Sequence, residues 1–210
     1  MERLEKFKER SLSWSSINSY LRSPKDWYSQ YIEGVKFQAT KKMAYGNIIG
    51  QKLSSDPTFL PEVKRYNIFE KELTALIELE DKKIKLIGYL DSMDMDTKAF
   101  YEYKTSSSTT RWTQETAEAT GQILFYMLLL WINYGIRPED ISCHLFYIPV
   151  RQKENFDMEL SGEEVQCFEV KHTSEEVIKF GKYIEKMHDR MIKYVEKKLS
   201  PVLVAEQNKK

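Results

Sequence analysis

The sequence predicts an α/β fold in which a small mixed β-sheet is flanked by helices. Three segments with the two-residue alternation of strands precede a long apolar helical segment, and another apolar strand follows that helix. A strand–helix–strand order implies a right-handed parallel crossover, which places both strands in one sheet. The 210 residues are enough for one domain with a sizeable core.

The strand predictions rest on alternation and on turn residues. Strands are expected at 66–80, 83–93, 99–105 and 143–150. The second alternates most regularly, because Leu86, Gly88 and Leu90 point one way while Tyr89 and Asp91 point the other. Residues 156–171 are ambiguous and could form a hairpin.

The helix predictions rest on helical spacing and on capping residues. Aromatic residues between Ser15 and Ile32 recur at helical spacings, and Pro24 divides them into two short helices with Ser23 capping the second. Further helices are expected at 43–54, at about 113–134 and at 175–199. We expect one domain over 13–200, between a charged leader at 1–12 and a polar tail at 201–210.

Composition excludes several classes of protein. Thirty-two basic residues balance thirty-two acidic ones, so net charge gives no support for a nucleic-acid partner, although a local basic patch would suffice. The two cysteines, Cys143 and Cys167, form no CxxC pair, which argues against a disulfide framework and a four-cysteine metal site. The charged start is no signal peptide, and the longest apolar run, 123–132, is too short for a membrane span of roughly 20 residues.

Residues able to carry chemistry gather where the second and third predicted strands meet. Glu102 and Lys104 are two apart on one strand, so both leave the same face. Asp91 ends the preceding strand, and a short hairpin can bring it beside Glu102. Two adjacent carboxylates repel each other unless a divalent cation compensates them. Phosphodiester hydrolysis suits this set, because carboxylate-held metal ions activate water and a lysine stabilises negative charge.

The surroundings strengthen this interpretation. An ExK triplet alone is weak evidence for a catalytic site, since ion pairs on strand faces are common. Phe100, Tyr101 and Tyr103 indicate that this strand is covered, where an unpaired Glu or Lys is costly. Gln122 and Tyr126 share one face of an otherwise apolar helix. In isolation, these two could simply hydrogen-bond neighbouring backbone.

The order GxxD (88–91), ExK (102–104) and QxxxY (122–126) resembles the PD-(D/E)XK nuclease superfamily, most closely its RecB-like branch. The opening Ser-Trp-Ser-Ser at 13–16 and the Ser-Pro at 23–24, followed by aromatics, also resemble that branch. The resemblance implies a restriction-endonuclease-like core. It also implies a metal-dependent DNA nuclease, with exonuclease action in recombination, repair or phage DNA processing.

The resemblance assigns roles to particular residues. Asp91, Glu102 and the backbone carbonyl of Tyr103 would hold Mg²⁺ or Mn²⁺. Lys104 would be the catalytic lysine. On the helix that follows, Gln122 and Tyr126 would position the scissile strand or the catalytic residues.

Two positions depart from the branch. Gly50 stands where a metal-binding histidine is common in that branch. Either this ligand is missing, or water or a carboxylate such as Glu70 or Glu72 takes its place. The departure therefore allows a site with one metal ion. Ser23 stands where cluster-bearing members have their first cysteine. With two cysteines in the chain, no iron–sulfur cluster is expected.

Some residues outside these motifs are candidates for contact with a partner. Arg22, Lys25, Arg111 and Trp112 could contact DNA, or they are solvated charges and a packing residue. The expected partner is DNA, single-stranded or at its ends, without a membrane; a homo-oligomer and a recombination or repair protein are left open. The resemblance implies the cytoplasm of a prokaryotic or phage-infected cell. The alternatives are a catalytically weak nucleic-acid-binding module of nuclease fold, and a non-nuclease protein in which the motifs are coincidental.

Overall fold

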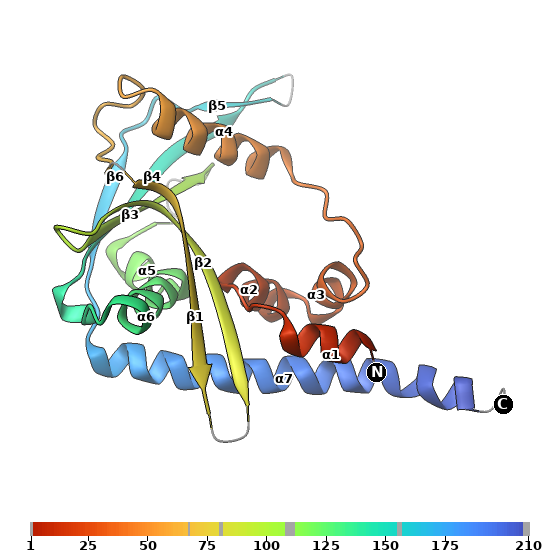
Figure 1. The fold of residues 1–210 in the computed structure, drawn as a ribbon. Coiled ribbons are helices and arrows are strands. Elements are labelled where there is room, and N and C mark those ends of the chain that lie inside the picture. The colour runs from red at the N-terminus through yellow and green to blue at the C-terminus, as the bar shows by residue number, and fades with distance from the viewer. Residues whose placement is uncertain (1, 67, 80–81, 108–111, 155–156, 208–210) are drawn as a thin grey trace.

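The computed structural model describes residues 2–66, 68–79, 82–107, 112–154 and 157–207, with side chains described as far as residue 200 (Figure 1). The helices are α1 (Glu2–Glu9), α2 (Trp14–Arg22), α3 (Pro24–Tyr31), α4 (Lys41–Ser55), α5 (Gln114–Glu118), α6 (Gly121–Tyr134), the 3₁₀ helix η1 (Pro138–Asp140) and α7 (Ser174–Gln207). The strands are β1 (Ile68–Glu78), β2 (Lys83–Asp94), β3 (Ala99–Ser106), β4 (Ser142–Gln152), β5 (Met158–Leu160) and β6 (Gln166–Val170).

The strands form one mixed sheet, which confirms the predicted α/β class. Its order is β1-β2-β3-β4, with β5 and β6 both pairing with β4. The β3–β4 pair is parallel, as the strand–helix–strand order predicts, and every other pair is antiparallel. The two β-strands that meet at the candidate residues, β2 and β3, are therefore central in the sheet.

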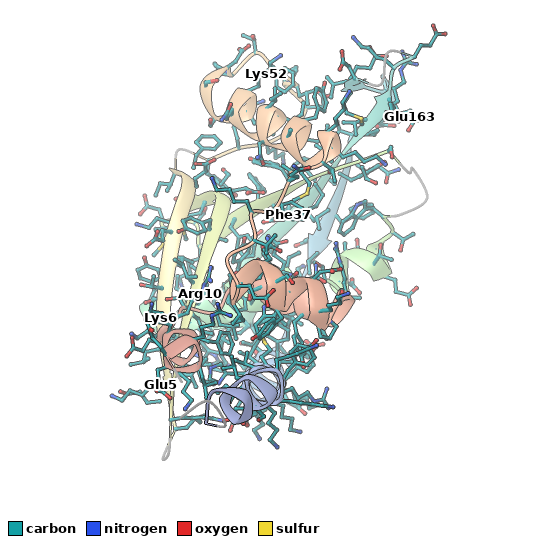
Figure 2. All side chains as sticks on the ribbon, turned by 90° about the vertical axis from the view of Figure 1, so that its right-hand side faces the viewer. Glu5, Lys6, Arg10, Phe37, Lys52 and Glu163 are labelled. Atoms are coloured by element: carbon teal, nitrogen blue, oxygen red, sulfur yellow. The ribbon has the colours of Figure 1, made fainter. Side chains whose placement is uncertain are left out.

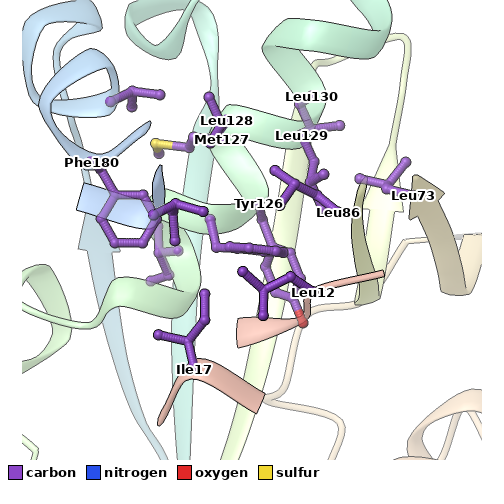
Figure 3. Packing of buried hydrophobic residues seen from close by; sticks show 14 of the residues in the cluster. Leu12, Ile17, Leu73, Leu86, Tyr126, Met127, Leu128, Leu129, Leu130 and Phe180 are labelled. Atoms are coloured by element: carbon purple, nitrogen blue, oxygen red, sulfur yellow. The ribbon is translucent and has the colours of Figure 1, made fainter. Parts of the chain in front are cut away.

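Helices cover the sheet on both faces. Helix α6 packs against β1 and β2, and α7 packs against α6 on its far side (Figure 1). This layer holds the main core, in which Leu73 and Leu86 of the sheet meet Leu129 of α6 (Figure 3). Helix α4 covers the opposite face, where Ile49 and Leu53 belong to a second, smaller core. The sheet is thus held from both sides at the level of the candidate site.

The two N-terminal helices follow the capping pattern in the sequence. The Ser23 hydroxyl accepts a hydrogen bond from the Asp26 N–H, and Pro24 opens α3, where its missing N–H costs nothing. Residues 2–12, expected as a charged leader, contain α1, and Phe7 is buried against Trp27. Leu12 bridges to Leu86 of β2. At the other end, α7 continues beyond the predicted 175–199 to Gln207.

The helix predicted at about 113–134 is wrong in one respect, because the chain forms two helices there. Helix α5 ends at Glu118, and α6 begins at Gly121. The Trp14 ring lies 2.2 Å from the place where a Cβ on Gly121 would stand. Only glycine therefore lets α6 start this close to α2.

The ambiguous segment 156–171 forms two strands that do not pair with each other. Strand β5 pairs with the end of β4, at Val150–Gln152, and β6 pairs with its beginning, at Cys143–Tyr147. The hairpin therefore lies between β4 and β5. Among the described residues, no helix has the length and apolar character needed to cross a membrane.

Gly88 of β2 sets how closely α6 approaches the sheet. A Cβ at this position would stand 2.8 Å from Leu129 Cδ1 and 2.9 Å from Tyr126 Cε1. Both distances are shorter than real Cβ contacts, so any side chain would push α6 outward. The glycine of the GxxD motif thus has a packing role: it seats Tyr126 over β2.

We expect Gly88→Ala to lower the free energy of unfolding by about 1–3 kcal/mol, because α6 must shift to make room. Gly181→Ala is the matched control, since its Cβ would meet Leu128 Cδ1 at 3.9 Å, an ordinary contact inside a helix. Gly181→Ala should raise the free energy of unfolding by about 0.5–1 kcal/mol, because alanine favours the helix over glycine. Urea unfolding of both variants measures this, and equal effects at the two glycines would contradict the packing role of Gly88.

Candidate functional site

The site begins where the pairing of β2 with β3 stops. The last paired residues are Ser92 and Tyr101, so Asp91 and Glu102 face each other one step beyond. Asp91 Oδ2 accepts a hydrogen bond of 2.8 Å from the Tyr103 N–H, which replaces the missing ladder bond. On its other side, β3 continues its parallel pairing with β4 through Ser106. Beyond Ser92 and Tyr101, β3 is therefore fixed by its pairing with β4 and no longer by pairing with β2.

Glu102 is a buried carboxylate, with 1% of its surface exposed. Its Oε1 accepts a hydrogen bond from Lys104 Nζ, two residues along the same strand. Its Oε2 is buried and has no hydrogen-bond partner among the described residues. A buried carboxylate oxygen without a partner is costly, and a cation in the adjacent space would satisfy it.

Lys104 belongs to a chain of hydrogen bonds that leads into α6. Its Nζ also donates to Gln122 Oε1 at 2.7 Å. Gln122 Nε2 donates to the Tyr126 hydroxyl at 2.8 Å, and that hydroxyl donates to the Tyr89 carbonyl at 2.5 Å. Burial raises the pKa of Tyr126, so the hydroxyl stays protonated as this chain requires. The helix thus fixes the lysine through two side chains one turn apart.

Burial also controls the charge of the two carboxyl groups. Removal from water, and then the neighbouring Asp91, raise the pKa of Glu102 to about 8, although the Lys104 ammonium lowers it. Burial raises the pKa of Asp91 as well, against the Lys104 charge and the Tyr103 N–H. Both groups therefore hold protons more tightly than ordinary carboxyl groups do. A cation that binds here must displace them.

Asp91, Glu102 and Lys104 open into a cavity of 530 Å³, the active-site cavity. Its walls come from α4, β1, β2, β3 and α6, and include Gly50 and Glu70. Glu70 has a φ of 49°, which is unusual for a residue with a side chain, and it stands opposite Asp91 in the β1–β2 register. Nothing lies within 4 Å of a Cβ placed on Gly50, so the space that a side chain at this position would occupy is open.

The donors around this cavity fit a divalent cation of the Mg²⁺ type. Within the described ranges, no group of three or more histidine, cysteine, aspartate or glutamate side chains is close enough to hold a metal ion. The available set is the Asp91 and Glu102 carboxylates with the Tyr103 carbonyl, which lies on the same side of β3 as its N–H. Mg²⁺ suits such a set, because it keeps several waters and uses few protein carboxylates.

The proposed substitutes for the missing histidine differ in position. Glu70 lines the active-site cavity. Glu72 does not, and its carboxylate accepts a hydrogen bond from the Tyr89 hydroxyl at 2.9 Å. Of the two, only Glu70 is placed to act toward a bound cation. Helix α4, on which the resemblance places Gly50 at the position of the histidine, forms a wall of this cavity, and Asn47 and Gln51 line it together with Gly50.

The predicted DNA-contact residues lie in different places. Arg22 lines a second cavity next to the first. Lys25 is exposed and lines neither cavity. Trp112 is partly buried and packs against the main core, as its packing alternative predicts. Arg111 lies outside the described residues.

Comparisons with known proteins identify a family and similar folds. The sequence model of the PD-(D/E)XK nuclease superfamily matches residues 51–207. The crystal structure of SSO0001 is similar at 15% identity and a TM-score of 0.50, covering 86% of this chain and 80% of that one. A phage-related exonuclease from Haemophilus somnus 129PT is similar at 14% identity and a TM-score of 0.49, covering 88% and 82%. At these identities the likeness concerns the fold alone. No curated protein matches the chain.

Mn²⁺ affinity should rise with pH, because the cation must displace the Glu102 proton. With the pKa of Glu102 raised to about 8, the carboxyl is protonated below that pH, and affinity should increase about tenfold per pH unit until it levels off there. Isothermal titration calorimetry from about pH 6 to about pH 9 measures this. In Glu102→Gln the pH dependence should become shallower, because only the Asp91 proton then remains to be displaced. A flat pH profile in the wild type would contradict the raised pKa.

Proposed function

The chain belongs to the PD-(D/E)XK nuclease superfamily, and from this premise we propose that it is a divalent-metal-dependent DNA nuclease that acts at strand ends. The observation that carries the proposal is the buried Glu102 Oε2, which has no hydrogen-bond partner among the described residues and belongs to a carboxyl group that interacts electrostatically with Asp91. An ordinary structural ion pair would leave no such oxygen. The role of each residue below is part of the proposal.

Asp91, Glu102 and the Tyr103 carbonyl hold the cation. When bound, Mg²⁺ or Mn²⁺ supplies polarisation of the phosphoryl oxygen and a lowered pKa for the attacking water. The Tyr103 N–H donates to Asp91 Oδ2 and so fixes the orientation of that carboxylate. Parallel pairing of β3 with β4 fixes the backbone that presents Glu102.

Lys104 stabilises the negative charge that develops on the phosphate and orients the water. Its ammonium group is held by Glu102 Oε1 and Gln122 Oε1, so it points into the active-site cavity without reorganisation. Gln122 and Tyr126 are positioning residues, because they act through the lysine. Their anchor is the Tyr89 carbonyl on β2.

A catalytically weak nucleic-acid-binding module is the second candidate. One observation favours it: among the described residues no three acidic, histidine or cysteine side chains are close enough to hold a metal ion together, and a side chain at Gly50 is absent. This candidate predicts DNA binding in EDTA and no cleavage with any divalent ion. Cleavage by the wild-type protein that depends on Mg²⁺ or Mn²⁺ would reject it.

Cleavage of end-labelled DNA should require Asp91 and Lys104. We expect Asp91→Asn and Lys104→Met each to lower kcat about 10²–10³-fold, because the first removes a ligand of the cation and the second removes the positive charge that stabilises the reacting phosphate. The matched controls are Asp96→Asn in the β2–β3 hairpin and Lys85→Met on the outer part of β2, which line neither cavity. Circular dichroism verifies folding. Equal activity in the wild type and both site variants would refute the nuclease proposal.

Action at strand ends is tested with closed and linear substrates. Circular single-stranded and covalently closed double-stranded DNA should persist while the linear forms of the same sequence are degraded. The Asp91→Asn variant gives the background for contaminating nucleases. Fast cutting of the circles would assign endonuclease action in place of exonuclease action.

Tyr126→Phe should lower kcat about tenfold, which corresponds to about 1.4 kcal/mol, because Gln122 loses the hydroxyl that orients it toward Lys104. Mn²⁺ affinity should stay within about twofold, since the Tyr126 hydroxyl hydrogen-bonds Gln122 and the Tyr89 carbonyl rather than a proposed cation ligand. Tyr134→Phe at the exposed end of α6 is the matched control. A fall in metal affinity as large as the fall in kcat would contradict a role through Lys104.

A further inference from the structure

A second cavity adjoins the active-site cavity and shares two of its wall residues. Its volume is 940 Å³, and Lys104 and Gln122 line both cavities. The other walls are α2, α3 and the strap, which we define as residues 32–40 between α3 and α4. The strap arches from α3 to α4 in Figure 1, and Phe37 lies on it between α4 and the α2–α3 pair in Figure 2. We call this space the strap cavity.

The strap cavity has the opposite charge character from the active-site cavity. Three cationic side chains, Arg22, Lys36 and Lys104, line it, and Asp26 is its one carboxylate. Arg22 and Lys36 make no ion pair with any carboxylate in the part of the chain that the structure describes. Unneutralised cations beside a phosphate-cleaving site favour the polyanion that the site would cleave.

The strap also presents apolar side chains that nothing in the described structure covers. Phe37 is 53% exposed and Val35 58% exposed, and both line the strap cavity. Trp14 also lines this cavity and is fixed, because its ring packs on Gly121 and 5.8 Å from the Phe180 ring. The lining therefore combines a fixed aromatic ring, an exposed aromatic ring and cations. Aromatic rings and cations in one cavity suit stacked bases joined by phosphates.

We propose that the strap cavity holds the nucleotides of a DNA single strand that adjoin the scissile phosphate, with Phe37 stacking on a base and Arg22 and Lys36 contacting phosphates. This inference rests on the proposed nuclease function. Size selects the single strand: a cavity of 940 Å³ falls in the range of roughly 300–1,000 Å³ that holds small ligands, so it takes a few nucleotides and no duplex. In a duplex, moreover, the bases are already stacked on one another and offer Phe37 no face.

The test measures binding of a fluorescein-labelled oligothymidine strand by anisotropy in EDTA, where no cleavage interferes. Phe37→Ala should raise Kd about tenfold through the lost stacking. Lys36→Glu should raise Kd and lower the dependence of log Kd on log salt by about 0.7 or more, the amount expected per phosphate contact on a single strand. Tyr134→Ala and Lys193→Glu are the matched controls on exposed parts of α6 and α7, and should stay near the wild-type Kd.

Duplex DNA of the same length is the second arm. The wild type should bind the single strand more tightly than the duplex, and Phe37→Ala should lose that preference. Strap variants with the Kd of the wild type, or equal loss in the two control variants, would overturn the proposal. Tighter binding of duplex than of single strand would overturn it as well. Binding in EDTA decides this question whether or not the wild type cleaves DNA, so failure of the nuclease proposal shows separately in the cleavage assay.

Discussion

Burial of the Glu102 carboxylate is the constraint on which the site depends. Its side chain is almost wholly removed from water, and a charge in that position costs several kcal/mol unless other groups compensate it. The Lys104 ammonium compensates Oε1, whereas Oε2 has no hydrogen-bond partner in the part of the chain that the structure describes. The pKa of Glu102 is accordingly raised. The same burial that makes the carboxyl group hold its proton prepares it to bind a cation in a place of low dielectric, where electrostatic interactions are strong.

Helix α6 links this constraint to the stability of the fold. Most of its surface is buried in the main core, so its position is fixed by packing. Gly88 allows the helix to approach β2, and Tyr126 then reaches the Tyr89 carbonyl. From that anchor, Gln122 holds Lys104. The geometry of the lysine is therefore a consequence of core packing, and a change in the core would be felt at the site.

Charge is separated between two neighbouring cavities, although the chain as a whole has a formal net charge of zero. Glu70, Asp91 and Glu102 make the active-site cavity acidic, whereas Arg22 and Lys36 make the strap cavity basic. Lys104 lies on the boundary and lines both. Acidic groups suit a cation, and basic groups suit a phosphate backbone, so the two cavities favour different parts of one reaction. Overall charge carries none of this information, because opposite local fields cancel in the sum.

The sequence by itself determined strands β1 to β4, their alternation and the order of Asp91, Glu102 and Lys104, because strand periodicity and residue spacing are local properties. It left residues 156–171, which contain β5 and β6, ambiguous. It also indicated Gln122 and Tyr126, which lie one helical turn apart. Tertiary structure alone decided how closely α6 begins to α2, since the ring of Trp14, more than a hundred residues away, occupies the place of a side chain at Gly121. It likewise decided that α1 packs on the core, that Glu70 rather than Glu72 lines the active-site cavity, and that the strap lies beside Lys104. These outcomes depend on contacts between distant segments, and residue spacing does not encode such contacts.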